Sequence, residues 1–208
     1  MKVPACVART SAVALLALTS LAPLAAAPGD PGPENAKAAA IFTAPAGIDN
    51  FGRISATYYR GAQPEGSDYA ALAALGVKTV INLTSFAAMA AEPGLVEAAG
   101  MKYVAMPMTT RVNPTPEQLE QFLSIVNDPK HQPVFVHCVG GKHRTGVMTA
   151  VYRMTQHTWT GEQAFKEMKQ FKYGADFLHP EFKKFVLGFS VPAPATQAPA
   201  LVAVSTQN

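Results

Sequence analysis

A cysteine and an arginine separated by five residues form the stretch of this chain with the clearest chemical potential. The sequence VFVHCVGGKHRTGVM, residues 134–148, is an apolar run that stops near Cys138, a glycine-rich turn, and a second apolar run that starts after Arg144. A turn of this kind between a strand and a helix directs backbone N–H groups and the positive end of the helix dipole toward one point. We therefore expect an anion-binding loop over residues 138–144.

The residue types in this loop suit phosphoryl transfer to sulfur. Gly140 and Gly141 permit backbone angles that a side chain forbids, and Arg144 can grip two oxygens of a phosphate group through its planar guanidinium. The helix N-terminus and the arginine both favour the thiolate of Cys138, which is a strong nucleophile. Thr145 can offer its hydroxyl to the sulfur as it leaves. The pattern predicts a phosphocysteine intermediate that water hydrolyses in a second step.

The segment HCVGGKHRTG resembles the signature of the protein tyrosine phosphatase superfamily in His137, Cys138, Gly141, Arg144 and Thr145. The resemblance implies that Cys138 is the nucleophile, that Arg144 binds phosphate and that the hydroxyl of Thr145 assists the second step. His137 is expected to orient the loop through its ring nitrogens. No metal or cofactor is implied.

The same resemblance extends over roughly the whole of residues 51–189, although only the cysteine loop is a specific motif. GKHRTG is most similar to the atypical dual-specificity phosphatases of plants and fungi, some of which act on inositol pyrophosphates. YYRGAQP at 58–64 and LGVKTVINL at 75–83 resemble the opening of bacterial members. The expected phosphate-binding residues are Val139, Gly140, Gly141, Lys142, His143 and Arg144.

Other functions fit the loop less well. A nucleotide-binding Walker loop needs Ser or Thr directly after its lysine, whereas His143 follows Lys142 here. Packing alone does not account for two glycines, a lysine, a histidine and an arginine after a buried strand. Three hypotheses therefore remain. They are a tyrosine or dual-specificity protein phosphatase, an inositol phosphate or pyrophosphate phosphatase, and a phosphate-binding module without turnover.

The general acid of the superfamily has no counterpart in the expected place. The family usually carries an aspartate on a loop upstream of the cysteine, and it protonates the leaving oxygen. The corresponding residues 106–116, MPMTTRVNPTP, contain neither Asp nor Glu. Glu117, Glu92 and Asp176 are the candidates, and the sequence does not choose between them.

Alternating strand and helix patterns place this loop in an α/β domain with a central, largely parallel sheet flanked by helices. Ligands of such sheets bind at the carboxyl ends of the strands, which is where Cys138 falls. Strands are predicted at 57–61, 77–83, 102–108 and 133–138. Helices are predicted after Ser67, at 92–99, after Thr115 and Thr160 with capping boxes to Gln118 and Gln163, after the glycine turn, and from Pro180.

The N-terminal residues 1–27 are predicted to be a signal peptide. Lys2 and Arg9 precede an apolar stretch that ends in small residues. That stretch is shorter than the roughly 20 residues of a membrane-spanning helix, and Pro23 interrupts it. We expect export to the periplasm or beyond, with no membrane association after cleavage.

The rest of the chain divides by composition. Residues 28–50 are rich in Pro, Gly and Ala and are predicted to be a linker, residues 51–189 the folded phosphatase domain, and residues 190–208 a flexible tail. The net charge of +3 gives no sign of nucleic-acid binding, so the expected partner is a phosphorylated substrate. Without residues 1–27, Cys138 is the single cysteine of the sequence, which excludes an internal disulfide.

Overall fold

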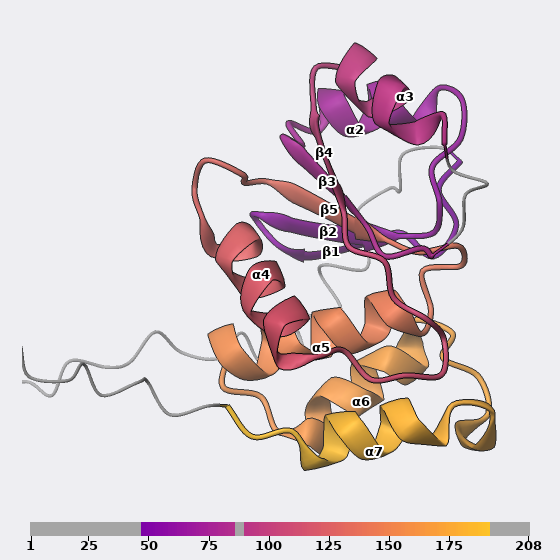
Figure 1. The fold of residues 1–208 in the computed structure, drawn as a ribbon, viewed down its shortest axis with the longest axis vertical. Coiled ribbons are helices and arrows are strands. Elements are labelled where there is room, and N and C mark those ends of the chain that lie inside the picture. Colours follow the sequence, from indigo (N-terminus) through magenta and orange to yellow (C-terminus); the bar gives the residue numbers. More distant parts are fainter. Residues whose placement is uncertain (1–46, 86–89, 192–208) are drawn as a thin grey trace, which may run out of the picture. The chain divides into compact units, whose positions relative to one another are not determined.

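The computed structural model describes residues 47–85 and 90–191 (Figure 1). The predicted signal peptide, most of the predicted linker and nearly all of the predicted tail lie outside these residues. The described fold begins slightly before residue 51, because Ile48 is buried in the core and the side chain of Asn50 bonds to the cysteine loop. None of the described helices is long and apolar enough to cross a membrane.

The described residues form a five-stranded sheet in the order β1-β2-β5-β3-β4, which confirms the predicted α/β class. β2, β5, β3 and β4 are mutually parallel, and only β1 runs antiparallel, against β2. The strands are β1 Gly52–Ser55, β2 Tyr58–Gly61, β3 Thr79–Asn82, β4 Lys102–Ala105 and β5 Val134–His137. β5 is therefore central, and its carboxyl end lies beside the ends of β2 and β3.

Helices cover both faces of the sheet (Figure 1). α2 (Asp68–Ala74) and α3 (Glu92–Ala98) lie on one face. α4 (Pro116–Asn127) and α5 (Arg144–Gln156) lie on the other. α6 (Gly161–Gln170) and α7 (Pro180–Gly188) pack against α5, and the short 3-10 helix η2 (Asp176–Leu178) precedes α7. This layering leaves the carboxyl edge of the strands to the loops.

Side chains of β5 alternate between the two faces, as the period of two along a strand requires. Val134, Val136 and Cys138 belong to the core cluster that α4 and α5 complete. Phe135 belongs to the cluster under α2 and α3, and its ring stacks on that of His137 at 5.6 Å between centroids. His137 and Cys138, although adjacent in sequence, therefore face opposite sides of the sheet.

The structure confirms the predicted strands and helices, with local differences. Both predicted capping boxes are present, Thr115 with Gln118 and Thr160 with Gln163. The cap predicted at Ser67 is wrong in its detail, because Ser67 precedes α2 without a side-chain capping bond. β1 was not predicted, since its four residues, GRIS, are too few to establish an alternating pattern.

Candidate active site

The predicted anion-binding loop comprises residues 138–144. It follows directly on β5 and includes the first residue of α5. It leaves the sheet at Cys138, whose residue is only 3% exposed, and enters α5 at Arg144. Gly141 has a φ of +61°, a left-handed conformation that favours glycine. The loop therefore curls back over the end of β5, with the sulfur on its floor and the N-terminus of α5 beside it.

The surroundings of Cys138 favour its thiolate. Burial raises the pKa of this thiol, but hydrogen bonds from the hydroxyl and the backbone N–H of Thr145, the charge of Arg144 and the backbone N–H of Lys142 outweigh burial and lower it. Thr145 is completely buried, and its hydroxyl has no other hydrogen-bond partner among the described residues. The loop donors and Arg144 thus favour the thiolate, which is the nucleophilic form of cysteine.

Arg144 is fixed by one edge of its guanidinium. Nη1 donates to the carbonyl oxygens of Met108, at 3.2 Å, and Leu83, at 3.3 Å. Its Nε is buried and has no partner among residues 47–85 and 90–191. A buried donor without an acceptor is costly, and a bound oxyanion would supply the acceptor. The side chain is only 4% exposed, so its orientation is set before any ligand binds.

Two side chains outside the loop hydrogen-bond to its backbone, and the sequence analysis did not place either of them in the site. Arg60 and Asn50 both donate to the carbonyl oxygen of Gly141, Asn50 Nδ2 at 2.8 Å. The guanidinium of Arg60 is completely buried and lies 4.1 Å from the ring centroid of Phe171. Burial lowers the pKa of Arg60 to about 10, so this side chain is still charged at neutral pH. The sequence did carry a signal for this role of Arg60. A charged residue within the predicted strand TYYRG has to find a polar partner when it is buried.

His137 is completely buried at the end of β5, and its Nε2 lies 3.0 Å from Oε1 of Glu92. The sequence predicted that the ring nitrogens of His137 orient the loop. It did not predict that Glu92, at the start of α3, provides the contact. Between the two residues lie 44 others, and no local pattern joins them.

The remaining loop residues differ in exposure. Lys142 is exposed and makes no ion pair among the described residues, whereas Val139 is half-exposed. The ring of His143 is half-buried, bonds through Nε2 to the carbonyl oxygen of Tyr173 at 2.8 Å and lies 3.8 Å from the ring of His179. Burial lowers the pKa of His143. Its side chain is thus engaged with the segment before α7.

The three candidate acids are all held as carboxylates. Glu117 lies exposed in the first turn of α4, and hydrogen bonds to its own backbone and to Thr115 lower its pKa. Asp176 bonds to Lys169 at 2.8 Å and Lys183 at 2.7 Å, and these bonds lower its pKa. Glu92, the first residue of α3, is buried and bonds to Tyr69, a member of the core cluster under α2 and α3, whereas Cys138 belongs to the other cluster. Burial raises the pKa of Glu92, but the contacts with His137, Gln63 and Asn82 outweigh it and lower the pKa. None of the three has the raised pKa that a general acid at neutral pH needs.

Comparison with known proteins identifies the family. Residues 48–183 match a protein family described as "PTP-NADK: DSP-PTPase phosphatase fused to NAD+ Kinase". The match covers more than half of the chain, and the chain belongs to this family. It confirms the resemblance to the tyrosine phosphatase superfamily that the cysteine loop predicted.

Individual relatives agree with this assignment. The chain is 28% identical over 142 residues to the dual specificity protein phosphatase TpbA of Pseudomonas aeruginosa strain UCBPP-PA14, covering 68% of this chain and 63% of TpbA. It is 27% identical over 138 residues to the inositol diphosphatase DSP2 of Oryza sativa subsp. japonica, covering 64% of this chain and 66% of DSP2. The chain thus spans slightly less than two thirds of the length of these relatives.

Solved structures share the fold. A crystal structure of P. aeruginosa TpbA superposes with a TM-score of 0.59 at 27% identity, covering 68% of this chain and 86% of that one. A cysteine-to-serine variant of TpbA in complex with pTyr superposes with a TM-score of 0.57, also at 27% identity, covering 67% of this chain and 83% of that one. The sheet and its helices are therefore those of the phosphatase family.

Proposed function

We propose that this chain is a cysteine-dependent phosphatase that hydrolyses phosphorylated substrates through a phosphocysteine intermediate. The observation that carries the proposal is the buried thiol of Cys138, with a lowered pKa, in a loop whose arginine is fixed while its Nε has no partner in the part of the chain that the structure describes. Arg144 and the loop N–H groups bind the phosphate, which brings phosphorus in line with the sulfur.

The reaction proceeds in two displacements at phosphorus. The thiolate of Cys138 attacks, the S–P bond forms, and the bond to the leaving oxygen breaks with its electron pair remaining on that oxygen. Water then attacks phosphorus and releases a proton to solvent, the S–P bond breaks with its electron pair returning to sulfur, and inorganic phosphate leaves. The hydroxyl of Thr145 donates to the sulfur as its negative charge returns, so Thr145 acts mainly in the second step.

The substrate class follows from the leaving group. With all three candidate carboxylates held ionised, we infer that no side chain among them protonates the leaving oxygen. Protonation of a poor leaving group is worth roughly 10² to 10⁴ in rate. Phenolic phosphates and phosphoanhydrides, whose leaving groups are stable anions, are therefore favoured over alkyl phosphates.

Two substrate classes fit this preference. The first is phosphotyrosine in proteins, in line with TpbA, a relative named as a dual specificity phosphatase and seen in complex with pTyr. The second is an inositol pyrophosphate, in line with the relative named as an inositol diphosphatase. The ammonium of Lys142 is exposed and forms no ion pair within residues 47–85 and 90–191. It favours the second class, since it offers a charge to a further phosphate.

The test of the chemistry is turnover of p-nitrophenyl phosphate in excess chelator by the wild type and by Cys138→Ser. We expect turnover that survives the chelator and is abolished in the variant, together with retained binding of inorganic phosphate. Turnover by Cys138→Ser would exclude the covalent mechanism. Phosphate binding without turnover by the wild type would assign the chain to phosphate-binding modules instead.

The test of substrate class is a series of aryl and alkyl phosphates, a phosphotyrosyl peptide and an inositol pyrophosphate. We expect kcat/KM to fall steeply as the pKa of the leaving group rises. Higher kcat/KM on the inositol pyrophosphate than on the peptide would select the second class. A flat series would show that a general acid operates, and repeating it with Glu117→Gln and Asp176→Asn would identify the acid.

We also propose that the chain is exported, on the strength of its N-terminal sequence. Residues 1–27 combine a positive start, an apolar stretch and small residues, and a domain whose one cysteine is Cys138 needs no disulfide in an oxidising compartment. Mass spectrometry of the protein from a periplasmic fraction would detect the shortened chain. Recovery of the intact chain from the cytosol alone would contradict export.

A further inference from the structure

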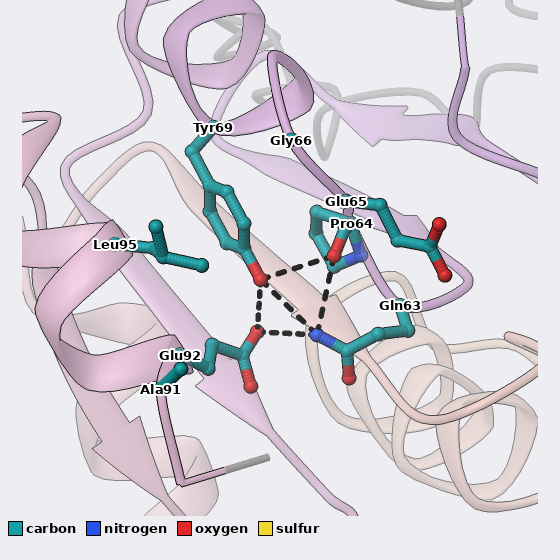
Figure 2. A pocket seen from close by; sticks show the side chains of 8 residues that line it. All are labelled: Gln63, Pro64, Glu65, Gly66, Tyr69, Ala91, Glu92 and Leu95. Atoms are coloured by element: carbon teal, nitrogen blue, oxygen red, sulfur yellow. Dashed lines mark hydrogen bonds between the residues drawn. The ribbon is translucent and has the colours of Figure 1, made fainter.

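Glu92 is the centre of a buried hydrogen-bond cluster next to the candidate active site. The carboxylate is at the first position of α3, and the residue is only 2% exposed. Its Oε1 accepts hydrogen bonds from Nε2 of Gln63 at 2.8 Å and the hydroxyl of Tyr69 at 3.2 Å, and Figure 2 shows these three side chains converging. The same oxygen lies 3.0 Å from Nε2 of His137.

The second carboxylate oxygen is also occupied. Oε2 of Glu92 accepts from Nδ2 of Asn82, which also donates to the hydroxyl of Tyr103 at 3.1 Å. Asn82 is itself fixed, because its Oδ1 accepts from the backbone N–H of Thr84 at 2.7 Å. Burial raises the pKa of Glu92, but the bonds from His137, Gln63 and Asn82 outweigh it and lower the pKa. The group is therefore a carboxylate that accepts hydrogen bonds from three side chains and contacts the ring of His137, unlike a proton donor.

The cluster reaches the cysteine loop on both sides of the sulfur. His137 directly precedes Cys138, and its ring is held between Glu92 and the ring of Phe135. Gln63, which donates its amide to Glu92, also donates its backbone N–H to the carbonyl oxygen of Val139 at 3.2 Å. His137 and Val139, on either side of the nucleophile in the sequence, are thus both linked to the carboxylate of Glu92, His137 directly and Val139 through Gln63. The contact runs through the side chain of His137, which faces the side of the sheet opposite the sulfur.

We propose that Glu92 is a positioning residue, which holds His137 and Gln63 so that the backbone on either side of Cys138 keeps the loop donors directed at the sulfur and at a bound phosphate. Only the turnover part of the test below rests on the proposed phosphatase activity. The state of the thiol can be measured whether or not the chain turns over any substrate.

The decisive experiment is the pH dependence of Cys138 alkylation by iodoacetamide in Glu92→Gln, with Glu97→Gln as the control. Glu97 is on the same helix but exposed. In Glu92→Gln an NH2 group replaces the oxygen that accepts from Nδ2 of Asn82, so that two donors face each other. His137 also loses an anionic partner. If the loop donors then drift from the sulfur, the alkylation profile moves to higher pH, and the rate at a fixed acidic pH falls by about three- to tenfold.

The direction of the shift separates positioning from simple electrostatics. Removing a nearby negative charge, with the geometry unchanged, would make the thiol more acidic and move the profile to lower pH. A shift to lower pH in Glu92→Gln would therefore overturn the proposal. A lowered melting temperature with an unchanged alkylation profile would overturn it too, because the role would then be structural only.

Two further variants keep the test decisive if Glu92→Gln does not fold. Glu92→Asp retains the charge but is one methylene shorter, so it cannot reach both His137 and Asn82, and positioning predicts the same shift to higher pH. Tyr69→Phe removes one donor to Glu92 without changing the ring, and a smaller shift in the same direction is expected. Unchanged profiles in these variants would refute positioning.

Turnover supplies an independent readout. For p-nitrophenyl phosphate we expect Glu92→Gln to lower kcat more than it changes KM, since the misdirected donors act mainly in the transition state. If Glu92→Gln changed kcat and KM no more than the control Glu97→Gln does, the result would count against the proposal. Absence of turnover in the wild type would instead refute the proposed function and leave the alkylation result to decide the role of Glu92.

Discussion

Gly141→Ala is expected to damage both the stability and the chemistry of the cysteine loop, and the structure sets the size of the damage. A Cβ at this position would lie 2.5 Å from the carbonyl oxygen of Gly61 and 2.7 Å from the backbone nitrogen of Ala62. Ordinary contacts of a carbon are nearer 3.5 Å, so the loop and the end of β2 must separate by roughly 1 Å. Both neighbours are backbone, which cannot rotate aside.

The cost in stability has two sources. An alanine at a φ of +61° is strained by about 1 to 2 kcal/mol, and overpacking adds about 1 to 3 kcal/mol. For a domain of this size we expect the melting temperature to fall by about 5 to 20 °C. Because folded proteins have about 5 to 15 kcal/mol of stability, the variant should remain largely folded at low temperature, where its turnover can be measured.

The cost in chemistry follows from the same displacement. The carbonyl oxygen of Gly141 is held by Arg60 and Asn50, so the loop cannot move by 1 Å without losing these bonds. Misplacement of this size can reduce turnover by about 10²-fold. Thermal unfolding and turnover of p-nitrophenyl phosphate in the folded fraction are the two assays.

Gly140→Ala is the matched control for stability. A Cβ there would meet only side-chain atoms of Lys142, at 3.6 Å, which is an ordinary contact, and Gly140 has no positive φ. We expect an unchanged or slightly raised melting temperature, because alanine restricts the unfolded chain. If Gly141→Ala melts and turns over like the wild type, the close approach to β2 is not what shapes the loop.

Three further outcomes are expected from the described contacts. Thr145→Ala should slow hydrolysis of the phosphocysteine, seen as a burst of released phenol, and should move alkylation of Cys138 to higher pH because the thiolate loses a donor. Because the pKa of Cys138 is lower when folded, folding releases a proton between that value and the unfolded value of about 8.5. The thiolate therefore stabilises the fold fully above pH 8.5 and loses this effect as the pH falls through the folded pKa, so the wild-type advantage over Cys138→Ala in chemical unfolding should increase with pH. Glu167→Gln should lower the free energy of unfolding by about 3 to 5 kcal/mol, because it leaves the buried guanidinium of Arg153, 2.6 Å from Glu167, without its counter-ion. Glu120→Gln, at an exposed position, should cost little stability. Equal melting temperatures for the two variants would contradict this.

Much of the site was predictable from the sequence because it is local. Cys138, Gly141, Arg144 and Thr145 lie within eight residues, and the strand before them and the helix after them determine where the loop leaves the sheet. The parallel α/β class was predictable for a similar reason, since the apolar period changes between two and 3.6 residues along the chain. The helices that begin at Thr115 and Thr160 were predictable from capping boxes, which are also local.

The tertiary structure decided which distant residues support the loop. Asn50, Arg60 and Glu92 reach it only because β2 and β3 flank β5 and end at the same edge of the sheet. Strand order arises from long-range packing, and a single sequence carries no pattern for it. The assignment of Glu92 shows the difference most clearly. From the sequence it was one of three candidate acids. In the structure it contacts His137, which faces the side of the sheet opposite Cys138, and it accepts hydrogen bonds from three other side chains. A carboxylate in this position is suited to holding the loop and not to donating a proton.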